Sequence, residues 1–125
     1  MANHTKVKPV HFISTIGVFS SPQSPIEVVR EQEDLENSGP LYVGYAQSKW
    51  VAETLVRIAG ERGIPVCIYR PGLGGHSQTG VFNAHDHVCI MAKGCIQLGC
   101  APDLDLILQI APADYVSQAI VHLSK

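Results

Sequence analysis

The sequence lacks the features that mark several large classes of protein. Nine basic residues stand against eleven acidic ones, so the formal net charge over 125 residues is only −2. Such a balance gives no positive surface for nucleic acid or for an anionic membrane. No apolar run approaches the roughly 20 residues that cross a bilayer, and residues 1–9 contain no signal-peptide core. These absences predict a cytoplasmic protein that binds neither nucleic acid nor membrane.

The sequence also lacks any Cys-x-x-Cys pair. Its cysteines are Cys67, Cys89, Cys95 and Cys100. Because they lie among apolar residues, we expect buried, reduced thiols rather than disulfides or metal ligands. The triplet His85-Asp86-His87 has no evident third ligand, and alternate residues diverge on a helix, so it is interpreted as a loop or helix cap and no metal is predicted.

What the chain does contain is a globular composition, with 46% hydrophobic and 16% charged residues. An apolar run within residues 7–14 predicts a buried strand, and residues 65–69 predict another. Between them, the acidic segment 20–40 predicts a solvated loop with a turn of helix, and residues 45–59 predict a helix. Its apolar stripe is formed by Val51, Leu55, Ile58 and Ala59. A strand, a crossover helix and a second strand make a βαβ unit, which requires a parallel sheet.

The rest of the chain predicts a glycine-rich loop over residues 72–83 and a helix over 85–98. A further strand is expected over 104–110. A last helix is expected over 114–123, with Asp114 as its N-cap. Its inward-facing residues are Val116, Ala119, Ile120 and Leu123.

Two residues of the predicted central helix have the spacing of an acid–base pair. Tyr45 and Lys49 are four positions apart, so they lie on one face of a helix, one turn from each other. An ammonium beside a phenol makes the phenol a better proton donor, which suits the reduction of a carbonyl. Ser14-Thr15 ends the first strand, and Arg70-Pro71-Gly72 follows the second. Since ligands bind at the carboxyl ends of parallel strands, the three segments are expected to border one crevice.

Several ordered motifs together resemble a known family. Thr15, the segment Tyr45-Ala46-Gln47-Ser48-Lys49 and the triplet Arg70-Pro71-Gly72 are similar to motif elements of the extended short-chain dehydrogenases/reductases. Residues 48–53, 68–72, 75–80 and 93–99 are similar to the thioester reductase branch. That branch comprises the terminal reductases of nonribosomal peptide and polyketide synthases, akin to carboxylic acid reductases. The resemblance runs from about residue 7 to residue 124.

The resemblance implies an NADPH-dependent reduction of an acyl or peptidyl thioester on a phosphopantetheine-bearing carrier protein, with an aldehyde or an alcohol as product. It implies that Tyr45 donates a proton to the carbonyl oxygen and that Lys49 strengthens the phenol as an acid while holding the nicotinamide ribose. Thr15 would orient the carbonyl. Pro71 and Gly72 would join Tyr45 and Lys49 in binding the cofactor. The substrate crevice would be bordered by Gly75, His76, Ser77 and Thr79.

The expected fold class is α/β, an incomplete Rossmann-type parallel sheet with flanking helices. Members of the family begin with a strand and a Gly-x-x-Gly-x-x-Gly turn that binds the cofactor pyrophosphate, and this sequence has no such motif. Its first strand matches the family's fifth. Residues 1–125 are therefore expected to form a single unit, the C-terminal portion of a reductase domain, with the loop 73–75 about one residue short.

Two other interpretations stay open. The chain could be a non-catalytic fragment or assembly module, because hydride transfer requires a held cofactor. It could also be a sugar-nucleotide epimerase or dehydratase of the same superfamily. A parallel strand without its neighbour leaves unpaired backbone groups, so we expect self-association or pairing with a separate N-terminal half.

Overall fold

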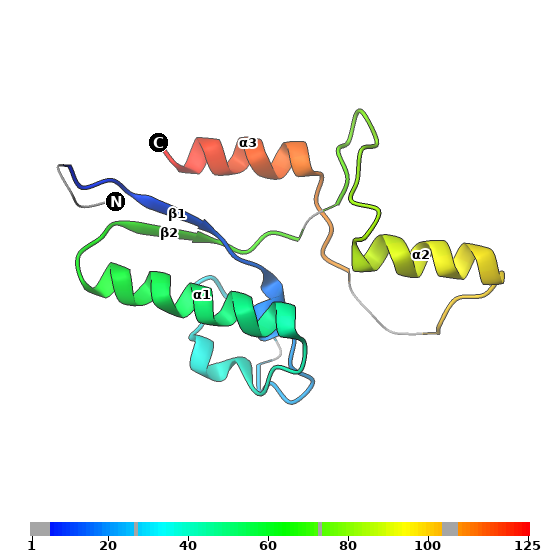
Figure 1. The fold of residues 1–125 in the computed structure, drawn as a ribbon, viewed down its shortest axis with the longest axis horizontal. Coiled ribbons are helices and arrows are strands. Elements are labelled where there is room, and N and C mark those ends of the chain that lie inside the picture. The colour runs from blue at the N-terminus through cyan, green and yellow to red at the C-terminus, as the bar shows by residue number, and fades with distance from the viewer. Residues whose placement is uncertain (1–5, 27, 73, 104–107) are drawn as a thin grey trace. The chain divides into compact units, whose positions relative to one another are not determined.

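The fold is known from a computed structural model, which describes residues 6–26, 28–72, 74–103 and 108–125 (Figure 1). The contacts divide the chain into two compact units, one formed by Met1–Pro71 with Ser124–Lys125 and the other by Gly72–Leu123. The first contains β1 (Val10–Ile13), the 3-10 helices η1 (Ile16–Phe19) and η2 (Leu35–Ser38), α1 (Gly44–Glu61) and β2 (Val66–Tyr69). The second contains α2 (His87–Leu98) and α3 (Ala113–Leu123). That residues 1–125 behave as one domain stays a prediction.

The first unit is the expected βαβ arrangement. β1 and β2 pair in parallel, with Val10 opposite Val66 and Ile13 opposite Tyr69, and α1 connects them. The chain is thus an α/β protein with a two-stranded parallel sheet of Rossmann type and flanking helices. The acidic loop was predicted to hold a turn of helix, and η2 confirms it.

The two strands are not buried on both faces, contrary to the expectation for β1. Val10 and Phe12 are half-buried, whereas His11 and Ile13 on the other face are exposed. Cys67 lies opposite His11 in the register and is also exposed. The prediction of buried thiols is therefore wrong: Cys100 is exposed too, and Cys89 and Cys95 are only half-buried. An apolar neighbourhood along the sequence does not bury a side chain that the strand directs to an uncovered face.

The small apolar core of the first unit lies between the two 3-10 helices and α1. Val18, Phe19 and Leu35 are buried there, and Trp50 of α1 packs against them. Trp50 also donates from Nε1 to the carbonyl of Leu35 at 3.1 Å, so its polar edge is satisfied at the margin of the core.

Helix α1 is rotated away from the orientation that its apolar stripe predicts. Val51 and Leu55 are 52% and 62% exposed, while the same helix buries Ala46 and Glu53 completely or nearly so. At 3.6 residues per turn, these two pairs lie on opposite sides of the helix. Polar contacts to the strand ends, described below, select the buried side. Of the predicted apolar stripe, Val51 and Leu55 are therefore exposed, whereas Ile58 and Ala59 are half-buried.

In the second unit, α2 begins two residues later than the predicted start at residue 85 and ends at residue 98, as predicted. The Asp86 side chain accepts hydrogen bonds from the amides of Val88 and Cys89, which confirms the helix-cap interpretation of the His85-Asp86-His87 triplet. Gly99 ends the helix in the left-handed conformation, with φ +67°.

The predictions around the last helix need three corrections. Residues 104–107 lie outside the described part of the chain, and residues 108–110 are not a strand. Helix α3 begins at Ala113, so Asp114 lies in its first turn rather than at the N-cap. Leu123 is 67% exposed, contrary to the inward orientation expected for it, and no residue of α3 is buried. No helix within the described ranges is both long and apolar enough to span a bilayer.

Candidate active site

The candidate catalytic residues of the first unit lie around the carboxyl end of β1. Lys49 donates from Nζ to the carbonyl of Ile13, the last residue of the strand, at 2.9 Å. The ammonium also lies 5.4 Å from the centre of the Phe12 ring, a cation–π distance. Two contacts to successive residues therefore fix the position of the lysine side chain relative to the strand end.

Tyr45 and Thr15 complete this group. Tyr45 lies in the first turn of α1, one turn before Lys49, and is 59% exposed, so its phenol is accessible to a ligand. Thr15 follows β1, and its Oγ1 accepts a hydrogen bond from the Gly17 amide at 3.1 Å as the N-cap of η1. Accepting that bond leaves the hydroxyl proton of Thr15 able to donate to a carbonyl oxygen.

A buried carboxylate that the sequence reasoning missed lies beside this group. Glu53 is fully buried on α1, and its Oε2 accepts a 2.6 Å hydrogen bond from the Ser14 hydroxyl. Arg70 donates from Nε to the same oxygen at 3.2 Å and pairs with Oε1 through Nη2. Arg57, one turn further along α1, pairs with Oε1 at 3.3 Å. The signal that could have revealed it is the spacing: Glu53 lies four residues after Lys49 and eight after Tyr45.

The protonation of Glu53 follows from these partners. Burial by itself favours the neutral acid, but the hydrogen bonds from Arg70 and Ser14 and the charges of Arg70 and Arg57 outweigh it, so the pKa of Glu53 lies below its ordinary value. The carboxylate is therefore charged in the folded protein at neutral pH. A buried charge with this many donors is a fixed part of the structure.

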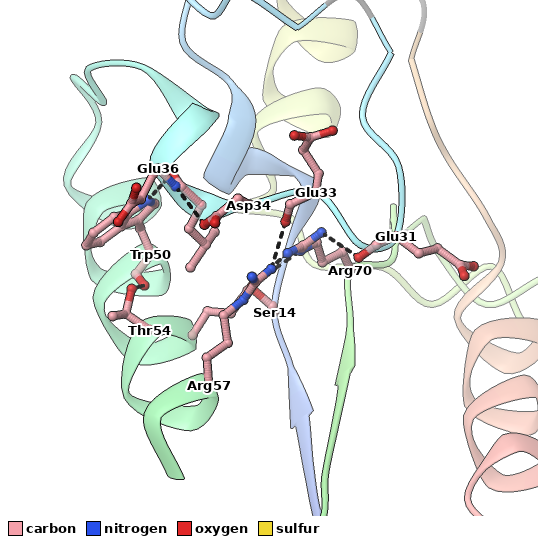
Figure 2. A network of polar contacts seen from close by, with 11 residues as sticks. Ser14, Glu31, Glu33, Asp34, Glu36, Trp50, Thr54, Arg57 and Arg70 are labelled. Carbon is pink, nitrogen blue, oxygen red and sulfur yellow. Dashed lines mark hydrogen bonds and ion pairs between the residues drawn. The ribbon is translucent and has the colours of Figure 1, made fainter. Parts of the chain in front are cut away.

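The same arginines hold the acidic segment against the unit through its main chain. Arg57 donates to the carbonyl of Glu33 at 2.9 Å, and Arg70 donates to the carbonyl of Glu31 at 3.5 Å (Figure 2). Because main-chain oxygens accept these bonds, the carboxylates of Glu31 and Glu33 take no part in them. Glu31 is exposed and Glu33 half-buried, in keeping with the predicted solvated loop.

The other predicted binding residues start at the end of β2 and continue into the second unit. Pro71 is the last residue before the division, and Gly72 is the first after it. A Cβ at Gly72 would lie 2.0 Å from the carbonyl oxygen of Gln109, so only glycine lets the two backbones approach this closely. Two backbone hydrogen bonds continue this contact. The Gly74 amide donates to the Ala111 carbonyl at 2.8 Å, and the Ala111 amide donates to the Gly72 carbonyl at 3.1 Å.

The predicted substrate loop is an ordered turn joined to α3. The His76 amide donates to the Val81 carbonyl at 2.8 Å, and the Gly80 amide donates to the His76 carbonyl at 2.9 Å. Asp114 accepts from both the amide and the hydroxyl of Ser77, at 2.9 and 2.6 Å. These bonds, chiefly the one from the Ser77 hydroxyl, lower the pKa of Asp114 to about 2. Thr79 is exposed on the same turn.

The predicted site residues thus fall into two groups. Thr15, Tyr45, Lys49 and Pro71 belong to the first unit, whereas the residues of the substrate loop and Gly72 belong to the second. Among the residues that the structure describes, no group of three or more histidine, cysteine or acidic side chains could hold a metal ion. An open groove of about 380 Å³ between η2 and α1 is lined by Leu35, Gln47 and Trp50 among others, and none of the predicted site residues lines it.

The parallel βαβ unit, with Lys49 of its helix bonded to the carboxyl end of β1 and Tyr45 one turn before it, defines a Rossmann-type fold. Comparison with known proteins gives the family. The model of the NAD-binding family described as "Male sterility protein" matches residues 1–120, and the chain belongs to this family.

Its relatives include a synthase and a reductase, according to their names. The chain is 48% identical over 126 residues to a linear gramicidin synthase protein of Brevibacillus parabrevis, across 99% of this chain and 2% of that protein. It is 43% identical over 98 residues to L-2-aminoadipate reductase of Saccharomyces cerevisiae, across 77% of this chain and 7% of that one.

A solved structure gives the same result for the fold. The terminal R domain from the myxalamid PKS-NRPS biosynthetic pathway matches with a TM-score of 0.86 and 51% identity, across 98% of this chain and 31% of that domain chain. The resemblance to terminal reductases of peptide and polyketide synthases is therefore confirmed. The chain spans less than a third of the length of each of these relatives.

Proposed function

We propose that this chain carries the catalytic residues for NADPH-dependent reduction of an acyl or peptidyl thioester, bound to a phosphopantetheine arm of a carrier protein, to an aldehyde or an alcohol. The observation that supports it most is the placement of Tyr45 and Lys49 at the carboxyl end of β1 in a chain 51% identical to a terminal R domain. The names of the other relatives, a synthase and a reductase, agree with a reduction rather than a sugar-nucleotide reaction.

The residues of the first unit fit a nicotinamide ribose. An ammonium has three N–H donors, and the bond from Lys49 to Ile13 uses one of them, so donors remain for the ribose hydroxyls. Pro71, directly after Arg70 at the end of β2, is the residue proposed to pack near the nicotinamide ring, with Gly72 next to it. When bound, NADPH supplies the hydride that reduces the thioester carbonyl.

The chain's own residues supply the proton and the orientation. Thr15 donates its hydroxyl proton in a hydrogen bond to the carbonyl oxygen and so orients the thioester. Tyr45 transfers its phenolic proton to that oxygen as negative charge develops on it, which gives a hemithioacetal. The hemithioacetal hydroxyl then gives up its proton as the carbon–sulfur bond breaks, so that the sulfur leaves as the carrier thiol and the aldehyde is released. Formation of the alcohol would need a second hydride and proton, from a second NADPH. Lys49 stabilises the phenolate that Tyr45 leaves behind.

The substrate loop is proposed to border the acyl chain. Gly75, His76, Ser77 and Thr79 lie on a turn that backbone bonds and Asp114 hold in one conformation, so its shape is set before a substrate arrives. A carrier protein with its phosphopantetheine arm is the proposed partner. Self-association or pairing with an N-terminal half stays a second proposal, motivated by the exposed strand face at His11 and Ile13.

The test is a titration of the full chain with NADPH, followed by cofactor fluorescence, and then an assay of aldehyde release from acyl-pantetheine thioesters. We expect Tyr45→Phe to lose at least a hundredfold in turnover, since general acid catalysis contributes about 10²–10⁴-fold. Tyr42→Phe is the matched control, because Tyr42 is 65% exposed three residues earlier and is assigned no role.

The outcomes separate the alternatives. Turnover of thioesters that Tyr45→Phe abolishes supports the proposal, whereas activity on sugar nucleotides alone would favour an epimerase or dehydratase. Failure to bind NADPH at millimolar concentration would refute the reductase proposal for this chain and leave a non-catalytic assembly module.

A further inference from the structure

We propose that Glu53 is the positioning residue of the candidate site: its buried carboxylate joins the carboxyl ends of β1 and β2 and fixes the Tyr45–Lys49 row of α1 relative to both. Its catalytic consequence rests on the proposed reductase function. The structural part of the proposal, that Glu53 sets the geometry of the strand ends, can be tested without any activity.

The carboxylate binds the two side chains that immediately precede proposed site residues. Its Oε2 accepts the 2.6 Å bond from Ser14, which is followed by Thr15. The same oxygen accepts the 3.2 Å bond from Arg70, which is followed by Pro71. One fully buried group therefore determines where the chain leaves each strand.

Helix geometry extends this control to the acid–base pair. Tyr45, Lys49 and Glu53 are spaced by four residues. Two successive turns of α1 contact two successive residues: Lys49 bonds the carbonyl of Ile13, the last residue of β1, and Glu53 bonds the side chain of Ser14 directly after it. Two contacts along one row prevent the helix from sliding or rotating against the strand. Tyr45, one turn before Lys49, takes its position from them.

The energetics favour a geometric role over a purely stabilising one. A buried ion pair loses much of its Coulombic gain to desolvation, and an apolar replacement of similar size is often as stable. The polar contacts also place Glu53 inside while Val51 and Leu55 of the same helix are exposed, an orientation that burial of apolar surface would not select. Displacements of about 1 Å at a reacting centre can cost a hundredfold in rate, so this geometry matters for catalysis.

The structural test compares hydrogen exchange at named amides in Glu53→Gln and Ser14→Ala. The Ser14 amide donates to Tyr69, and the Gly17 amide donates to the Thr15 hydroxyl oxygen, so both report on the carboxyl end of β1. The Val10 amide donates to Pro65 at the other end of the same strand pair and serves as the internal reference. We expect exchange at Ser14 and Gly17 to accelerate at least tenfold, with Val10 changed less than twofold.

Glu61→Gln is the matched control, since Glu61 is an exposed glutamate at the end of the same helix. It should leave all three amides unchanged. Equal acceleration at Val10 and Ser14 in the variants would mean general loosening and would overturn the proposal, as would no change at either. Ser14→Ala removes a single hydroxyl, so it gives the answer even where Glu53→Gln fails to fold.

The catalytic test separates this proposal from the one on which it rests. In a wild-type chain that reduces thioesters, Ser14→Ala should lower kcat at least tenfold with KM changed less than threefold, at a temperature where the variant is fully folded. Unchanged kcat with accelerated exchange would overturn the positioning role. If the wild-type chain binds no NADPH, the reductase proposal fails, while the exchange experiment still decides whether Glu53 fixes the strand ends.

Discussion

The two arginines that share Glu53 should differ sharply in their effect on stability. Both contact Oε1, but the Arg70 side chain is 10% exposed and the Arg57 side chain 30% exposed. Arg70→Met removes the nearly buried partner and leaves the buried Glu53 carboxylate with fewer donors to offset its desolvation. Removing one partner of a buried ion pair costs about 3–5 kcal/mol. Methionine keeps a contact with the Phe19 ring, over which the guanidinium lies at 4.8 Å, so little packing is lost.

Arg57→Met should cost much less. Solvent screens a pair of this exposure, so the ion pair contributes about 0.5 kcal/mol, and the lost bond to the Glu33 carbonyl adds about 1 kcal/mol. With roughly 4 °C of melting temperature per kcal/mol for a chain of this size, we expect a fall of about 12 °C or more for Arg70→Met and about 6 °C for Arg57→Met.

The assay is thermal unfolding by circular dichroism at neutral pH, with urea unfolding to check that the m-value is unchanged. Adding Arg70→Met to Glu53→Leu should then cost far less than Arg70→Met alone, because the carboxylate that it leaves unpaired is gone. Equal losses for the two single arginine variants would refute the reasoning, since burial of the partner would then not decide the energy.

Three further predictions concern other parts of the chain. The folded pKa of Glu53 lies below its ordinary value of 4.5, so the stability that the carboxylate contributes is complete above pH 4.5 and is lost as the pH falls through the folded pKa. In urea titrations at several pH values, wild-type stability should therefore fall more steeply under acid than that of Glu53→Gln. Asp114→Asn should reduce the protection of the Ser77 amide relative to its intrinsic exchange rate. Acidification of the wild type through the folded pKa of about 2 should do the same, whereas unchanged protection would mean that the carboxylate does not hold the turn. Iodoacetamide should alkylate Cys67 and Cys100 of the folded chain before Cys89, as mapped by mass spectrometry; simultaneous modification would contradict their different exposure.

Local pattern was sufficient to predict most of the elements of the first unit. The apolar run before Ser14, the helix that contains Tyr45 and Lys49 and the run before Arg70 correspond to β1, α1 and β2. Periodicity and turn residues act over a few positions, so one sequence reports them directly. The motif order was specific enough to indicate the reductase family, because several spaced motifs rarely coincide by chance.

What only the tertiary structure decided is which side of each element is covered. The sequence carries the apolar stripe of α1 at Val51 and Leu55, yet the helix buries Glu53, because Ser14 and Arg70 offer it donors from two other segments. Those partners lie 39 and 17 residues away, beyond any local pattern. The exposure of Cys67 likewise depends on whether anything covers its face of the sheet. A residue's type sets what it can bind, and the fold determines which groups come within its reach.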